Sequence, residues 1–225
     1  IKQNIIVPNK IDTVSKTWVI VTNNIKNNTG VINVNSGKTI FIDQKYTEDS
    51  SLQKFVNDKV SFNNLKYIPN DLVLLNWDYI VDKKWQQQAR IEAVNALIKM
   101  SQDFYDYFWE KIVVVSAYRS YDYQKWIKDR WCSDLFCAKA WYSEHQSGLA
   151  LDFFEATSKE EFLSNSEYNN YYVWLKNNAH NYGFHNSYQN GRDIDWYVVE
   201  PWHWRYLWVE LATKLFNNKE TFSQW

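Results

Sequence analysis

Glycine is scarce in this chain, and tryptophan is abundant. The 225 residues include 5 Gly and 13 Trp, whereas average usage would give roughly 16 Gly in a chain of this length. Turns with a positive φ and the C-terminal ends of helices ordinarily use glycine, because a Cβ is strained there. A globular protein with so little glycine therefore has an unusual set of turn residues, and the shortage needs an explanation.

An excess of charge of either sign is also missing. Lys and Arg number 25 and Asp and Glu number 26, for a formal net charge of -1. The chain therefore has no basic field for nucleic acid and no acidic tail. No run of 18 or more apolar residues occurs, so we expect no membrane span. The chain begins at Ile1 rather than Met, and we expect that a signal or anchor segment is absent from it.

Cysteine is limited to Cys132 and Cys137, five positions apart. We favour a local disulfide that closes this short loop, which would suit an exported protein. Two free thiols are the alternative. A zinc knuckle is disfavoured, because no second pair of ligands lies nearby at the usual spacing.

The chain is long enough for one full core and a small appendage. Residues 1–62 form a predicted β-rich region, because β-branched runs at 17–22, 31–34 and 39–42 are separated by Asn-rich turns. This region contains no catalytic constellation, and it is either a packing appendage or part of a cell-wall module. Residues 63–225 are the second predicted domain.

Helical and strand patterns are interleaved in the second domain, with short turns between the later strands. Helices are predicted over residues 87–108, 120–126, 168–181 and 207–216, with a short one from Ser158. Strands are predicted over residues 112–115, 149–154 and 197–199. This pattern favours an α+β fold with a small central antiparallel sheet flanked by helices.

Two histidines and an aspartate stand out among these elements. His145 and Asp152 lie in SEHQSGLALD (143–152), and His203 ends EPWH (200–203). A single histidine is more often a surface or core residue than a metal ligand. Two histidines with a carboxylate, however, are typical of a catalytic zinc site that keeps its fourth position open. We therefore interpret the three residues as ligands of one zinc ion.

Three neighbouring residues fit roles around such an ion. Glu200 can take a proton from a zinc-bound water and pass it to a leaving amine. Arg119 follows a predicted buried strand and can bind a substrate carboxylate bidentately, although an isolated arginine is more often part of a surface salt bridge. Trp202 flanks His203 and either lines the metal site or belongs to the core.

The ordered motifs SAYRSY with Gln124, SEHQSGLALD, YGF and EPWHWRY closely resemble those of the VanY-type zinc D-alanyl-D-alanine carboxypeptidases and their L,D-carboxypeptidase relatives. The resemblance covers about residues 65–217. It implies Zn²⁺ on the two histidines and the aspartate, with Glu200 as general base and acid. It also implies that Arg119 binds the substrate's C-terminal carboxylate. Further candidate substrate contacts are Gln124, Ser143, Trp202 and Tyr206.

The function implied by this resemblance is removal of a C-terminal D-Ala from peptidoglycan stem peptides, by D,D- or L,D-cleavage. One alternative is an endopeptidase on the same scaffold, which Arg119 argues against because it demands a free carboxylate. Another alternative is a non-catalytic cell-wall binding module. We expect a bacterial, extracytoplasmic protein of the cell envelope that acts as a monomer and binds no nucleic acid.

Four tryptophans stand where the family pattern usually has glycine: Trp109, Trp141, Trp196 and Trp208. An indole in place of a turn glycine should cause strain or a clash at each position. We hypothesise that the gene uses a code in which UGA specifies glycine, and that these codons were read as tryptophan. The alternative is that all four are genuine residues of an adapted protein.

Overall fold

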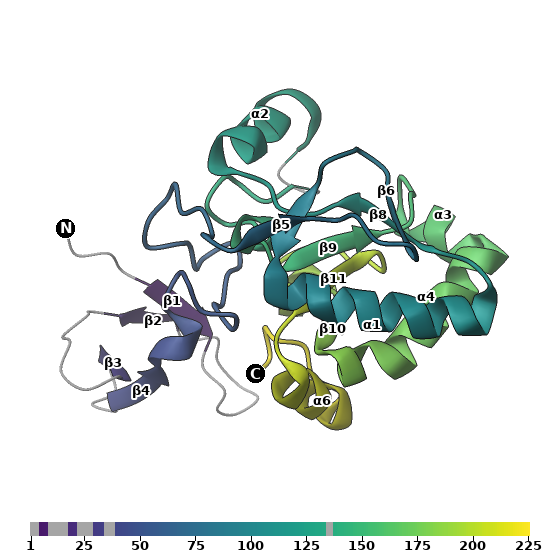
Figure 1. The fold of residues 1–225 in the computed structure, drawn as a ribbon. Coiled ribbons are helices and arrows are strands. Elements are labelled where there is room, and N and C mark those ends of the chain that lie inside the picture. Colours follow the sequence, from purple (N-terminus) through teal and green to yellow (C-terminus); the bar gives the residue numbers. More distant parts are fainter. Residues whose placement is uncertain (1–4, 9–17, 22–28, 34–38, 134–136) are drawn as a thin grey trace.

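A five-stranded sheet forms the centre of the protein (Figure 1). The computed structural model describes residues 5–8, 18–21, 29–33, 39–133 and 137–225. The strand order is β10-β11-β9-β8-β6, with bounds Phe184–Asn186, His203–Tyr206, Ala150–Phe153, Ile112–Ser116 and Ile80–Asp82. Neighbouring strands are antiparallel, except for the parallel pair β6 and β8. The predicted α+β class is confirmed.

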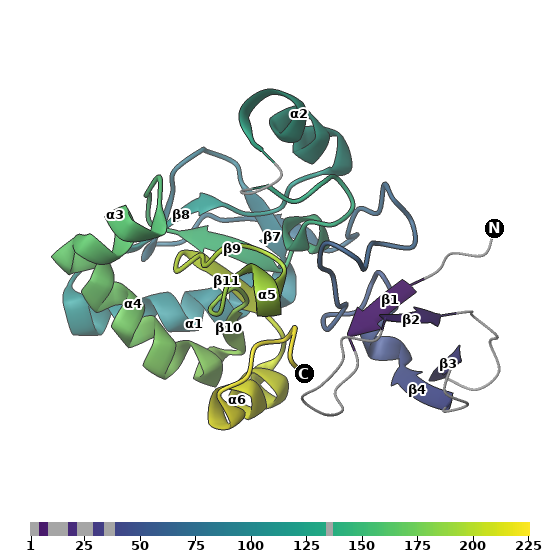
Figure 2. The same ribbon diagram turned by 180° about the vertical axis from the view of Figure 1, so that it is seen from behind.

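Helices pack around this sheet. They are α1 Ile91–Phe108, α2 Tyr121–Trp131, α3 Lys159–Ser164, α4 Ser166–Asn178, α5 Arg192–Asp195 and α6 Val209–Asn218. Three 3₁₀ turns are η1 Gln44–Tyr46, η2 Glu144–Ser147 and η3 Ala179–Tyr182. Helices α1 and α4 run together along one face of the sheet, and α2 lies at the opposite side of the molecule, as Figures 1 and 2 show.

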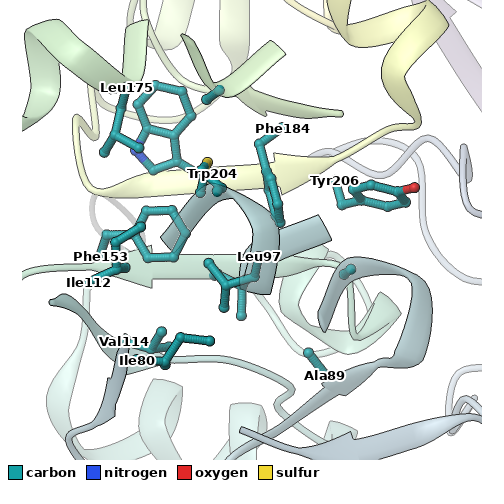
Figure 3. Packing of buried hydrophobic residues seen from close by; sticks show 14 of the residues in the cluster. Ile80, Ala89, Leu97, Ile112, Val114, Phe153, Leu175, Phe184, Trp204 and Tyr206 are labelled. Atoms are coloured by element: carbon teal, nitrogen blue, oxygen red, sulfur yellow. The ribbon is translucent and has the colours of Figure 1, made fainter. Parts of the chain in front are cut away.

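Helix α1 supplies much of the core. Leu97, Met100 and Phe104 on its inner face are fully buried, and Leu97 lies between the sheet residues drawn in Figure 3. Burial of each such side chain contributes about 1.5–3 kcal/mol. The helix begins later than predicted, because residues 88–90 form strand β7 (Gln88–Arg90), which pairs with β5 (Leu72–Leu74).

Local capping residues stand at several element ends. Ser120 and Ser158 accept hydrogen bonds from backbone N–H groups in the first turns of α2 and α3. Gly183 ends η3 with a φ of 86°. Helix α2 continues beyond residue 126, to Trp131.

The strand predicted over residues 197–199 is wrong, and strand β11 lies a few residues later. After α5 the chain turns at Trp196, which has a φ of 70°. The Tyr197 hydroxyl then donates to Tyr142 O at 3.1 Å, and the Glu200 N–H donates to Tyr188 O at 3.0 Å. Val198 and Val199 are β-branched and favour a strand. The contacts of Tyr197 and Glu200 nevertheless hold the segment as a loop.

The N-terminal region contains a second sheet with strand order β1-β2-β3-β4. The strands are Ile5–Pro8, Trp18–Val21, Thr29–Asn33 and Thr39–Asp43, and all pairs are antiparallel. Three of these strands overlap the predicted β-branched runs and the first was not predicted, and the β-rich region over residues 1–62 stays a prediction.

Residues 44–62 pack closely against the C-terminal part of the chain. The Phe55 and Phe222 rings meet edge to face at 5.0 Å, and the Arg205 guanidinium donates to Lys54 O at 3.1 Å. The proposed domain boundary at residue 62 stays a prediction.

Cys132 and Cys137 form the predicted disulfide. It closes the loop after α2 and holds residue 137 beside the pocket described below. Among the described residues, no helix combines the length and apolar character needed to cross a membrane.

All four tryptophans that replace expected glycines have a positive φ. The values are 59° for Trp109, 64° for Trp141, 70° for Trp196 and 74° for Trp208, and Trp85 joins them at 62°. Three glycines share this conformation: Gly148, Gly183 and Gly191. The tryptophans therefore share the positive φ of these three glycines.

Candidate active site

Strand register and one tight turn bring the three candidate ligands together. His203 of β11 lies opposite Asp152 of β9 in the antiparallel ladder. His145 lies in η2, which ends at Gly148 with a φ of 68° and leads directly into β9. The side-chain donor atoms of these three residues all lie within 4.8 Å of one another.

Each histidine presents a different ring nitrogen to this cluster. His145 Nδ1 lies 2.7 Å from Ala117 O. Its buried Nε2 makes no hydrogen bond with the described residues and lies 3.2 Å from Asp152 Oδ2. His203 Nδ1 lies 3.0 Å from Asp152 Oδ1. Two imidazole nitrogens and a carboxylate, buried and converging, suit Zn²⁺ and leave a coordination position open.

Charge interactions favour an ionised aspartate. Burial opposes the charge on Asp152, but His145 and His203 hold the pKa of its carboxyl well below the ordinary value. Burial and the nearby Arg119 charge lower the pKa of His145 to about 4. Burial also opposes the charge on His203, yet hydrogen bonds to Asp152 and Glu144 raise the pKa of its ring to about 10. Before any cation binds, the charge on the His203 ring balances that of the Asp152 carboxylate.

Glu200 lies at the edge of the cluster. Its Oε2 is 3.9 Å from His203 Nδ1, and Asn186 Nδ2 donates to its backbone O at 2.8 Å. Burial raises the pKa of the Glu200 carboxyl to about 7, with the His203 charge opposing this rise and the Asp152 charge adding to it. A carboxyl with a pKa near neutrality can both take up and release a proton.

Arg119, Gln124 and Ser143 line the same pocket. Arg119 Nη2 lies 3.9 Å from Asp152 Oδ2, and its Nε has no partner among the described residues. Gln124 Nε2 donates to Ala138 O at 2.8 Å, while the buried Gln124 Oε1 has no partner there. The full lining is Arg119, Gln124, Cys137, Ala138, Ser143, His145, Tyr188, Tyr197, Glu200 and His203.

Trp202 and Tyr206 lie elsewhere, contrary to expectation. Side chains alternate along β11, so Tyr206 points away from the face that carries His203. Tyr206 packs edge to face on Phe184 at 5.5 Å, as Figure 3 shows. Trp202 packs on Phe162 at 6.0 Å and belongs to the border of the core. Neither residue lines the pocket.

Several residues beside the ligands were not predicted. The buried Glu144 lies 2.9 Å from His203 Nε2, and the buried Ser187 donates to Glu144. Tyr188 stacks on the His203 ring at 4.6 Å. Arg205 is fully buried on the same face of β11. The alternation of β11 could have placed Arg205 beside His203, but no sequence signal pointed to Ser187 or Tyr188.

The other two histidines line a separate cavity at the edge of the sheet, beside β10. His180 stacks on Phe216 with ring centroids 3.7 Å apart. His185 is buried, and burial lowers the pKa of its ring to about 4. Neither belongs to a cluster of potential metal ligands among the described residues.

The sequence of residues 86–209 matches the VanY family model, described as D-alanyl-D-alanine carboxypeptidase. This match covers more than half of the 225-residue chain. The protein therefore belongs to the VanY family.

Individual relatives agree with this assignment. The chain is 34% identical over 172 residues to the YodJ protein of Bacillus subtilis (strain 168), and 27% identical over 175 residues to a D-alanyl-D-alanine carboxypeptidase of Enterococcus faecium. These alignments cover 71% and 77% of this chain but only 61% and 52% of the relatives. The chain thus spans a little over half the length of these curated relatives.

Solved structures show the same fold. The LdcB LD-carboxypeptidase superposes with a TM-score of 0.66 at 28% identity, covering 87% of this chain and 92% of that protein. A VanY D,D-pentapeptidase in complex with Zn(II) superposes with a TM-score of 0.59 at 23% identity, covering 78% of this chain and 98% of that protein.

Proposed function

We propose that this protein is a zinc-dependent carboxypeptidase that removes a C-terminal D-Ala from peptidoglycan stem peptides. The observation that carries the proposal is the convergence of His145, Asp152 and His203 within 4.8 Å, beside a Glu200 carboxyl whose pKa is about 7. The VanY family membership supports the substrate class.

The zinc ion would be held by His145 Nε2, the Asp152 carboxylate and His203 Nδ1. When bound, it supplies Lewis acidity for the scissile carbonyl and for an attacking water. The buried Nε2 of His145 faces Asp152 Oδ2 at 3.2 Å but makes no hydrogen bond with the described residues. This supports the assignment, because a buried polar atom without a hydrogen bond is costly unless something binds it.

Glu200 moves the proton in this mechanism. Its carboxylate takes a proton from water as the water oxygen attacks the peptide carbonyl carbon, and it returns that proton to the departing amine nitrogen as the C–N bond breaks. A pKa of about 7 suits both transfers, because neither protonation state is strongly favoured.

Arg119 binds the free carboxylate of the terminal residue. Its guanidinium faces the pocket 3.9 Å from Asp152, and its Nε has no partner among the described residues. Gln124 and Ser143 line the pocket beside it and hydrogen-bond the substrate backbone. A requirement for a free C-terminus distinguishes this enzyme from an endopeptidase on the same scaffold.

The disulfide between Cys132 and Cys137 supports an extracytoplasmic location, because such bonds persist in oxidising compartments. Peptidoglycan stem peptides are found in the same envelope compartment. We expect the protein to act there as a monomer.

The decisive experiment follows D-Ala release from tetrapeptide and pentapeptide stems, with and without a chelator. We expect chelator-sensitive release from at least one stem, and the preferred stem separates L,D- from D,D-cleavage. Amidation of the stem's C-terminus should abolish release. Equal cleavage of amidated and free-acid stems would instead indicate an endopeptidase. A zinc-loaded protein that releases nothing from either stem would indicate a binding module.

A further inference from the structure

His203 is held at both ring nitrogens. Its Nδ1 faces Asp152 Oδ1 at 3.0 Å, and its Nε2 faces Glu144 Oε2 at 2.9 Å. A neutral imidazole carries one N–H and one lone pair. If Nδ1 binds a metal, the proton must therefore lie on Nε2 and be donated to Glu144.

Glu144 is itself fixed in a buried position. Its side chain is only 3% exposed, and its Oε2 also accepts from Ser187 Oγ at 2.7 Å. Its Oε1 lies 3.9 Å from Arg205 Nη1. The Arg205 guanidinium in turn donates to Lys54 O at 3.1 Å. The Glu144 carboxylate is thus anchored from two directions, and it cannot swing away from His203 without leaving these partners.

The two ligand histidines are oriented in different ways. His145 is directed by a backbone carbonyl, Ala117 O, at 2.7 Å, and carries its free nitrogen at Nε2. His203 is directed by a side-chain carboxylate. A carboxylate adds negative charge to the imidazole it binds, whereas a carbonyl supplies only a dipole, so the carboxylate makes the opposite nitrogen more basic.

We propose that Glu144 is a positioning residue for the metal site: its carboxylate fixes the His203 ring with Nδ1 toward the metal and strengthens that nitrogen as a ligand. Glu144 touches neither substrate nor metal, and it acts only through His203. This inference rests on the proposed zinc site, but it is independent of which peptide is cleaved.

The test measures zinc affinity by competition with a chromophoric chelator in the full chain, for wild type, Glu144→Ala and Glu144→Gln. Loss of such a partner typically weakens metal binding about 10–100-fold, and we expect this for Glu144→Ala. Glu144→Gln keeps the volume and one acceptor oxygen, so we expect an affinity between those of Glu144→Ala and wild type. The visible spectrum of the Co²⁺-loaded protein should also shift in both variants.

Asp195→Asn is the matched control, because Asp195 is also fully buried and hydrogen-bonded but does not contact the ligands. It should bind zinc as wild type does. Wild-type affinity in both Glu144 variants overturns the inference, as does an equal loss in Asp195→Asn. If Glu144→Ala fails to fold, wild-type affinity and an unchanged Co²⁺ spectrum in Glu144→Gln overturn it alone. Absence of zinc binding in the wild type overturns the proposed function instead.

Five tryptophans share a backbone conformation that residues with a Cβ rarely adopt. Trp85, Trp109, Trp141, Trp196 and Trp208 all have φ between 59° and 74°. Trp208 combines a φ of 74° with a ψ of 149°, close to a region used almost only by glycine. The C-cap position of Trp109 in α1, with a φ of 59° and a ψ of 22°, is where helices most often carry glycine.

Three of these side chains bury little of the indole, whereas the Trp141 ring stacks on the Tyr121 ring at 5.4 Å. The side chains of Trp85 and Trp109 are 79% and 77% exposed, and that of Trp208 is 47% exposed. In contrast, Trp204 is 2% exposed and lies in the core, where Figure 3 shows it between Leu175 and Phe184. Trp85, Trp109 and Trp208 keep much of their indole surface exposed and occupy turns with a positive φ, whereas Trp204 is buried in the core.

We infer that the natural protein carries glycine at these five positions, and that their codons are UGA in a code where UGA specifies glycine. Position 85 was not anticipated from the family pattern, so the backbone conformation extends the set independently. The inference concerns only these five residues, and it leaves core tryptophans such as Trp174, Trp202 and Trp204 unchanged.

Sequencing the gene and measuring peptide masses of the protein from its natural host test this inference. We expect UGA at the five codons, UGG at the codons for Trp174 and Trp204, and glycine in the peptides that span the five positions. UGG at the five positions would overturn the inference. UGA at both groups of codons, with tryptophan in the peptides, would overturn it as well.

Discussion

The metal site and the turns around it differ in how well their residues suit the backbone. In the site, His203 and Asp152 lie opposite each other on regular paired strands. His203 Nδ1 faces Asp152 Oδ1 at 3.0 Å. In the turns, Trp109 and Trp208 hold left-handed or glycine-like conformations with exposed indoles. The comparison shows that the candidate ligands converge from regular strands, whereas these turn residues adopt conformations that strain a residue with a Cβ.

The largest effect is expected from a change within the site. Glu200→Gln removes the proton acceptor while preserving volume and burial. General acid–base catalysis typically contributes about 10²–10⁴-fold, so we expect kcat to fall by that factor while Tm and zinc affinity stay close to wild type. Steady-state kinetics and thermal unfolding check this. Retention of more than a tenth of wild-type kcat would contradict the role of Glu200.

Replacing tryptophan by glycine should lower the free energy of unfolding in the core and raise it at a turn. The change in the core should be the larger. Trp204→Gly removes a side chain that is 2% exposed, and deletions of this size cost about 3–5 kcal/mol. Chemical denaturation should show a large fall in the free energy of unfolding. A loss below about 1 kcal/mol would mean that Trp204 is not part of the core packing.

The next largest effect is expected on kcat/KM when the residue proposed to bind the substrate carboxylate is changed. Arg119→Ala removes a charge-assisted hydrogen-bond donor, and such bonds contribute about 1.5–3 kcal/mol, so we expect kcat/KM to fall roughly 10–150-fold for free-acid stems. Arg119→Lys keeps the charge but loses the bidentate geometry, and it should recover only part of the loss. If both variants matched wild type, Arg119 would not bind the carboxylate.

A pH profile tests the state of Glu200. The pKa of its carboxyl is raised to about 7, and only the deprotonated form accepts a proton, so kcat/KM should fall about tenfold per pH unit below that pKa. A cation bound nearby lowers the pKa of a carboxyl, which places this acid limb at or below pH 7. A profile that is flat from pH 4 to 8 would argue against Glu200 as the base.

The smallest effect is the stabilisation expected at a turn. Trp109→Gly relieves a left-handed conformation that costs a residue with a Cβ about 1–2 kcal/mol, while glycine loses more chain entropy on folding. We expect a net gain of about 1 kcal/mol, or roughly 2–4 °C in Tm for a chain of this size. Thermal unfolding of Trp109→Gly and Trp204→Gly under the same conditions compares the two changes in Tm directly. Destabilisation by Trp109→Gly would show that the indole is needed there.

Local signals predicted elements well where the pattern was strong. The helical spacing within α1 and the strand at 112–115, which the structure extends to Ser116, were both recognisable. The prediction failed at 197–199, where two β-branched residues suggested a strand that tertiary contacts replace by a loop. It also put Tyr206 at the site, because motif adjacency does not reveal which face of a strand a residue occupies.

The residue types of this chain were enough to predict a metal site without a structure. His145, Asp152, His203 and Glu200 are identifiable because ligand atoms and proton carriers depend on side-chain identity, and the motifs that carry them are specific. The glycine shortage was equally visible in the composition.

Only the tertiary structure decided how these residues are supported. The contact of Glu144 with His203 joins positions 59 apart in the chain, and the sign of φ at Trp85 depends on a turn that no local pattern marked. Long-range contacts and backbone dihedrals emerge from packing of the whole chain, so they could not be assigned from residue types alone.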